Sequence, residues 1–162
     1  MPSLQPKSSP VEEEDQPVRG AIREIIPEVL YQRGQILTWQ REKKFAVFKD
    51  LGIKTVVNLW PKQDPDLAES QVVNYLQLSA VRSEMMLESR METAARYVAE
   101  LCQEHPTLVL CEAGKTRSVY FCILVVSFLQ EVSLREAMDQ VVGRIGSVSL
   151  KKFMLDRINQ RK

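Results

Sequence analysis

The stretch Leu110 to Ser118, LCEAGKTRS, decides the predicted fold of this 162-residue chain. An apolar, strand-like segment, residues 107–110, leads into it, and an apolar, helix-like segment, residues 119–129, follows it. The backbone N–H groups of this loop should therefore lie at a helix N-terminus, a place that attracts anions. Cys111 and Arg117 stand six positions apart across the loop, and that spacing can wrap one phosphate group.

The side chains of the loop suit nucleophilic attack on phosphorus. A thiol near a guanidinium at a helix N-terminus ionises more readily than a free cysteine, and the thiolate is the nucleophilic form. Arg117 can hold two phosphate oxygens with its planar fork, and Ser118 adds a hydroxyl beside the sulfur. We therefore expect Cys111, Arg117 and Ser118 to be the catalytic residues. The expected phosphate-binding residues are those of the loop itself: Glu112, Ala113, Gly114, Lys115, Thr116 and Arg117.

Two other interpretations of the loop compete with a cysteine-dependent phosphatase. One is a plain strand-to-helix turn that holds a buried cysteine and a surface arginine. The other is a nucleotide-binding Walker loop, because Gly114, Lys115 and Thr116 match the last three positions of that motif. The motif also needs a glycine five positions before Gly114, where this chain has Val109. Without that turn the backbone is not shaped to cradle a diphosphate, so the Walker interpretation is disfavoured.

Composition and charge exclude several classes of function. The net charge of +1 gives no overall field that would favour nucleic acid or a membrane surface as a partner. The longest apolar run, residues 119–129, is shorter than the about 20 residues that cross a bilayer, so we expect no transmembrane segment. We also expect a monomer.

The cysteines and the histidine bear on location and on metal binding. Three cysteines, an odd number, indicate a reducing compartment, and we expect a cytoplasmic protein. Cys102 and Cys122 should be buried as apolar residues. His105 is the single histidine, and no two cysteines have the short spacing that is typical of zinc ligands. We therefore expect no metal site and no cofactor.

The rest of the chain alternates between strand-like and helix-like patterns. Residues 1–20 contain four prolines and an acidic run, and we expect them to form a disordered tail. The polar stretch 61–69 should be a loop at the end of a buried strand. Expected strands lie near 29–31, 53–60, 75–78 and 107–110, and expected helices near 40–50, 91–102, 119–129, and from 133 and 149 onward. This order predicts an α/β fold in which helices flank a mostly parallel central sheet.

The segment CEAGKTRS resembles the Cys-x5-Arg-Ser/Thr signature of the protein tyrosine phosphatase superfamily. The surroundings resemble its dual-specificity branch, through VLYQRGQ and LGIKTVVNL within residues 29–60 and through SFLQEVSLREAMDQVVGR at 127–144. The resemblance covers most of residues 22–160 and is weakest in the middle. Low-molecular-weight phosphatases have a similar loop near the N-terminus, unlike this chain, whereas rhodanese-like and arsenate-reductase-like proteins stay open as minor alternatives.

The resemblance implies a catalytic domain over residues 21–162 that hydrolyses phosphomonoesters through a phosphocysteine intermediate. The implied substrates are either proteins that contain phosphotyrosine, phosphoserine or phosphothreonine, or phosphoinositides. Lys115 in the loop resembles a feature of phosphoinositide-directed members of the family as well as of protein-directed ones. No cofactor is implied. The alternative is a phosphate-binding pseudophosphatase or interaction module with weak or no catalysis.

Two departures from the family pattern motivate that alternative. The family has histidine immediately before the cysteine, where this chain has Leu110, and the loss should leave a slower or more alkaline enzyme. The family also has an aspartate as general acid beyond the strand at 75–78, where this chain has none. Glu84 is the nearest carboxylate, and Asp64 and Asp66 could reach the same site from another strand end. Without a general acid, phenolic leaving groups should be favoured.

Overall fold

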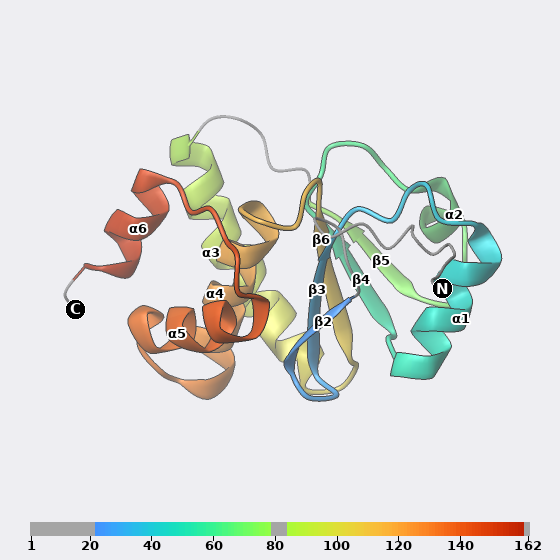
Figure 1. The fold of residues 1–162 in the computed structure, drawn as a ribbon, viewed down its shortest axis with the longest axis horizontal. Helices are drawn as coiled ribbons and strands as arrows, with labels where there is room; N and C mark the ends of the chain where they lie inside the picture. Colours follow the sequence, from blue (N-terminus) through green and yellow to red (C-terminus); the bar gives the residue numbers. More distant parts are fainter. Residues whose placement is uncertain (1–21, 79–83, 161–162) are drawn as a thin grey trace, which may run out of the picture.

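The computed structural model describes residues 22–78 and 84–160, with side chains from residue 90 onward in the second part. The predicted disordered tail at residues 1–20 lies outside the described residues. A five-stranded sheet in the order β2-β3-β6-β4-β5 forms the centre of the described part (Figure 1). Its strands are β2 (Arg23–Ile26), β3 (Leu30–Gly34), β4 (Thr55–Asn58), β5 (Asn74–Gln77) and β6 (Thr107–Cys111). The helices are α1 (Arg41–Leu51), α2 (Pro65–Ala68), α3 (Glu84–Cys102), α4 (Arg117–Gln130), α5 (Leu134–Ile145) and α6 (Lys152–Ile158).

The sheet is mostly parallel, as predicted. Strands β3, β6, β4 and β5 run in the same direction, and β2 pairs antiparallel with β3 at one edge. The predicted α/β fold with flanking helices is therefore confirmed. The sequence did not predict β2, a four-residue strand in which only Ile25 is fully buried, because so short an edge strand has almost no apolar alternation to detect.

Successive side chains of the central strands enter two different cores. On β6, Leu108 and Leu110 belong to the core on the side of α1, whereas Val109 and Cys111 belong to the core that contains the buried residues of α3, α4 and α5. This alternation is the period of two expected of a strand. Figure 1 shows α1 and α2 on one side of the sheet and the other four helices on the opposite side. Two apolar layers therefore hold the sheet between them.

Residues that cap helix ends lie where the sequence predicted them. Gly52 ends α1 in the left-handed conformation, with φ 75°. Ser133 and Glu136 form a complete capping box at the start of α5. The helix predicted from residue 149 begins instead at Lys152.

The prediction of a plain loop over residues 61–69 is wrong in part, because this stretch contains the short helix α2. Asp64 caps α2, and its side chain accepts hydrogen bonds from the N–H groups of Asp66 and Leu67. Pro65 occupies the first position of the helix, where its missing N–H costs nothing.

No helix in the described part of the chain is long and apolar enough to cross a membrane. Likewise, the side chains of His, Cys, Asp and Glu among the described residues form no group of three or more that could hold a metal ion.

Candidate active site

The loop that follows β6 lies at the C-terminal end of the central strand. Strand β6 is flanked by β3 and β4, both parallel to it, and Gly34 at the end of β3 pairs in register with Cys111. The Leu59 N–H, just beyond β4, donates to the Leu110 carbonyl at 2.8 Å. Open α/β sheets bind ligands at the C-terminal ends of their strands. The position of the loop therefore suits a binding site.

Two glycines bring the loop against β3. Gly114 has φ +76°, and a Cβ atom there would lie 2.5 Å from the Gly34 nitrogen. A Cβ atom on Gly34 would in turn lie 2.9 Å from the Glu112 carbonyl oxygen and from the carbonyl carbon of Ala113. The Gln35 N–H also donates to the Glu112 carbonyl at 3.1 Å. The path of the loop thus depends on the absence of a side chain at both glycines.

The structure brings the predicted nucleophile and the predicted hydroxyl together. The Cys111 Sγ and the Ser118 Oγ are 3.0 Å apart, and both residues are buried. Cys111 ends β6 and Ser118 lies in the first turn of α4, so the strand and the helix fix this pair.

Gln32 is a residue of this site that the sequence analysis missed. It lies on β3, is completely buried, and donates from Nε2 to the Gly114 carbonyl at 2.8 Å and to the Ser118 Oγ at 2.7 Å. A buried polar side chain needs such partners. Its signal in the sequence is weak, because β3 reads LYQRG and the amide stands between two apolar residues and an arginine.

Arg117 is half-buried at the first position of α4. Its Nη1 atom is buried and has no hydrogen-bond partner among the described residues. A buried guanidinium N–H without an acceptor is costly, and an oxyanion held by the loop would supply one. The helix is also left without a side-chain cap at Thr116, which suits an anion at its N-terminus.

The far side of the loop is braced by the segment that precedes α6. The Thr116 Oγ1 donates to the Ser149 carbonyl at 2.7 Å, and the Ser149 N–H donates to the Lys115 carbonyl at 2.9 Å. Lys115 is only partly exposed.

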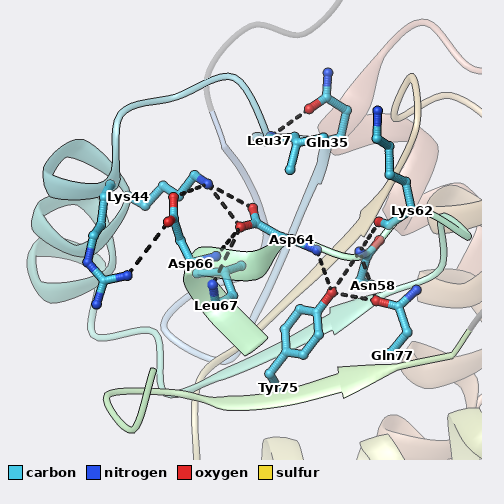
Figure 2. A network of polar contacts seen from close by, with 11 residues as sticks. Gln35, Leu37, Lys44, Asn58, Lys62, Asp64, Asp66, Leu67, Tyr75 and Gln77 are labelled. Carbon is cyan, nitrogen blue, oxygen red and sulfur yellow. Dashed lines mark hydrogen bonds and ion pairs between the residues drawn. The ribbon is translucent and has the colours of Figure 1, made fainter. Parts of the chain in front are cut away.

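Asp64 and Asp66, two of the predicted general acids, are engaged by Lys44 of α1. The buried Lys44 Nζ lies 3.0 Å from both carboxylate oxygens of the buried Asp64 and 2.7 Å from Asp66 Oδ2. Arg41 is a further partner of Asp66, at 3.6 Å. The hydrogen bond from Lys44 lowers the pKa of Asp66. Figure 2 shows this cluster, in which Lys44 links α1 to the start of α2.

The third predicted general acid, Glu84, is the first residue of α3, and its side chain lies outside the described residues.

A second polar network, also missed by the sequence analysis, joins the ends of β4 and β5. Asn58 Nδ2 donates to the Tyr75 hydroxyl at 3.0 Å and to the Gln77 Oε1 at 3.2 Å, and the Tyr75 hydroxyl bonds to the same Oε1. Gln77 Nε2 donates to the Trp60 carbonyl at 2.6 Å, and the Asp64 N–H donates to the Tyr75 hydroxyl at 3.1 Å. Figure 2 shows the contacts of Asn58, Tyr75, Gln77 and Asp64, which tie the chain between β4 and α2 to β5.

The other two cysteines are chemically unlike a nucleophile. Cys102 and Cys122 are buried, as predicted. Burial raises the pKa of the Cys102 thiol to about 11 and that of the Cys122 thiol well above its usual value. Both therefore stay in the unreactive thiol form at neutral pH.

Solved structures with the same fold include dual-specificity and related phosphatases. Human DUSP28 is 17% identical, with a TM-score of 0.68 over 93% of this chain and 94% of that chain. PTPMT1 in complex with PI(5)P is 12% identical, with a TM-score of 0.67 over 85% of this chain and 91% of that one. The human tyrosine phosphatase-like serine/threonine/tyrosine-interacting protein is 18% identical, with a TM-score of 0.60 over 85% of this chain and 92% of that one.

No protein-family model matches the sequence, and no curated protein matches it significantly. The similarity is therefore one of fold. It confirms that the chain has the fold of the dual-specificity cysteine phosphatases, which its sequence resembles.

Proposed function

We propose that this chain, which has the fold of the dual-specificity cysteine phosphatases, hydrolyses phosphomonoesters through a phosphocysteine intermediate. The observation that supports this most is the loop itself. Cys111 ends the central strand with its Sγ 3.0 Å from the Ser118 hydroxyl, and Arg117 across the loop has a buried guanidinium nitrogen without a hydrogen-bond acceptor among the described residues.

In the first step, the Cys111 thiolate attacks phosphorus in line with the leaving oxygen. The S–P bond forms as the P–O bond breaks, and the leaving group departs with the electron pair. Arg117 and the N–H groups of the loop stabilise the charge on the phosphoryl oxygens. This step requires no metal.

In the second step, water attacks the phosphorus of phosphocysteine. The O–P bond forms, the P–S bond breaks, and the electron pair returns to the Cys111 sulfur. Both water protons leave on dihydrogen phosphate, so charge balances. The Ser118 hydroxyl stabilises the departing thiolate by donating a hydrogen bond to it.

The candidates for the proton donor to the leaving group are the carboxylic acids of Asp64, Asp66 and Glu84. Proton donation at neutral pH needs a raised pKa, whereas Lys44 lowers that of Asp66 and also pairs with Asp64. Their contacts favour a structural role for Asp64 and Asp66, so we propose Glu84 as the donor. Aryl phosphates, whose leaving groups need the least protonation, are the substrates of choice for a first assay.

The experiment measures hydrolysis of an aryl phosphate, a phosphotyrosine peptide and a phosphoinositide, with and without vanadate. We expect turnover that vanadate inhibits, and loss of at least about a hundredfold in Cys111→Ser and Arg117→Ala. Cys102→Ser is the matched control, because it changes a buried cysteine outside the loop. Full turnover by Cys111→Ser would rule out the thiolate mechanism, and the relative rates on the three substrates identify the substrate class.

A phosphate-binding module without efficient catalysis is the second candidate. It is favoured by Leu110, which packs into the apolar core on the α1 side where the family has histidine. A phosphatase-like interacting protein also shares the fold. Wild-type protein that binds a phosphotyrosine peptide through Arg117 but releases no phosphate would support this candidate instead.

A further inference from the structure

We propose that Gln32 is a positioning residue that holds the Ser118 hydroxyl as a hydrogen-bond donor to the Cys111 sulfur. The proposal rests on the proposed function, since it assigns a role within the same site. It follows from three hydrogen bonds around one buried amide on β3.

The orientation of the Gln32 amide is set from both ends. Arg23, its register partner on β2, lies with Nη1 at 3.2 Å from the Gln32 Oε1, and a guanidinium can only donate. At the other end, the Gly114 carbonyl can only accept, and it lies 2.8 Å from Nε2. The amide nitrogen therefore faces the loop.

This orientation decides what the Ser118 hydroxyl can do. Gln32 Nε2 donates to the Ser118 Oγ at 2.7 Å, which uses a lone pair of that oxygen and leaves its own proton to be donated elsewhere. The Cys111 Sγ lies 3.0 Å from the same oxygen, and a thiolate can only accept. Hence Arg23 donates to Gln32, Gln32 donates to Ser118, and Ser118 can donate to the Cys111 thiolate, which is the final acceptor.

The chain matters most when the P–S bond breaks. At that moment the electron pair returns to the sulfur, and a hydroxyl already oriented as a donor stabilises the new charge without reorganisation. An acceptor in place of the Gln32 amide nitrogen would instead take the Ser118 proton away from the sulfur. The prediction therefore concerns the polarity of residue 32 as well as its size.

Two variants separate polarity from packing. Gln32→Leu removes the donor, and Gln32→Glu keeps the size, keeps the pairing with Arg23, and replaces the donor with an acceptor. Arg23→Met, at the partly buried edge of the sheet, releases the amide without touching the loop and serves if the buried substitutions impair folding. Tyr31→Phe is the matched control, because Tyr31 precedes Gln32 on β3 but belongs to the core on the other face.

The first readout is the second-order rate of Cys111 alkylation by iodoacetamide across pH, which needs no turnover. The second is the decay of phosphocysteine in a burst experiment with an aryl phosphate. We expect Gln32→Leu to slow both by about tenfold, Gln32→Glu to slow both by at least as much, Arg23→Met to slow both less, and Tyr31→Phe to change neither.

A double-mutant cycle shows whether Gln32 acts through Ser118. In a Ser118→Ala background, Gln32→Leu should cause no further slowing of either readout. If it slows alkylation equally in both backgrounds, or in neither, Gln32 does not position the hydroxyl and the proposal is overturned. If wild type hydrolyses nothing, yet alkylation of Cys111 depends on Gln32 through Ser118, the proposed function fails and the positioning role stands.

Discussion

Gly114 shows how strictly single residues define the site. Its φ is +76°, and a Cβ atom at this position would lie 2.5 Å from the Gly34 nitrogen, so there is no room for a side chain. A backbone atom cannot move aside as the end of a flexible side chain can, and any larger residue must therefore displace the loop.

We therefore expect Gly114→Ala to lower phosphatase activity at least about tenfold and to destabilise the fold by about 1–3 kcal/mol. The measurements are aryl phosphate hydrolysis and the urea-unfolding midpoint. Gly143→Ala in α5 is the control, since a Cβ atom there meets nothing within 4 Å, and it should stabilise by about 0.5–1 kcal/mol. Normal activity in Gly114→Ala would contradict the close approach of the loop to β3.

The sequence predicted the residues of the loop but could not predict what supports them. Cys111, Arg117 and Ser118 stand within one short stretch, where spacing alone indicates their relation. Gln32 lies 86 positions before Ser118, and only the pairing of β3 with β6 brings the two together. A contact of that range leaves no periodic or local signal in a single sequence.

Among the elements, α1 and α2 are joined by an ion pair buried in the fold. Lys44 and Asp64 are 1% and 5% exposed at their side chains. Lys44 also pairs with the more exposed Asp66, and it compensates the buried charge of Asp64. The apolar spacing of residues 40–50 predicted α1. It did not predict an ion-pair partner for Lys44, because the stretch that contains α2 was expected to be a loop.

Replacing Lys44 by Met should leave the Asp64 carboxylate buried without its cation and cost about 3–5 kcal/mol in the free energy of unfolding. Lys44→Met combined with Asp64→Asn should recover much of that loss, because Asn removes the charge and still caps α2. Denaturant unfolding measures both, with the exposed Lys49→Met as control, expected within about 0.5 kcal/mol of wild type. Equal loss in the single and the double variant would argue against a charge effect.

The same cluster makes stability depend on pH. The pKa of Asp66 is lower in the folded protein, mainly through the hydrogen bond from Lys44, so the unfolded chain binds more protons as pH falls below the ordinary range of an aspartate. This contribution is present above the unfolded pKa and is lost as pH falls through the folded one. Thermal unfolding between pH 6 and pH 2 should therefore show a steeper acid loss in wild type than in Asp66→Asn; parallel curves would show that Asp66 contributes nothing.

At the scale of the whole molecule, the order of strands and helices along the chain was enough to predict the fold. The parallel strands β3, β5 and β6 are each followed by a helix that the sequence predicted, and such a chain has few ways to cover a sheet on both faces. The edge strand β2 and the polar network around Asn58 were not predicted, since both depend on contacts between strands rather than on local patterns.

An oxyanion that binds the loop should stabilise the entire fold. Ligands that bind only the native state raise its unfolding free energy, by about 2.7 kcal/mol at a hundred times the dissociation constant. We expect tungstate or vanadate to raise the melting temperature of wild type but not of Arg117→Ala, while Lys49→Met responds as wild type does. An equal rise in Arg117→Ala would mean that the anion binds elsewhere.

The brace between Lys115, Thr116 and Ser149 has a consequence for how the site forms during folding. The loop is held from one side by Gln32, 82 positions before Gly114, and from the other by Ser149, 33 positions after Thr116. Contacts so distant along the chain close late, because the entropy of bringing them together must be offset by the rest of the fold. Nascent or truncated chains that already contain the cysteine and the arginine should therefore lack a working anion site until the strands on both sides of β6 and the segment before α6 are in place.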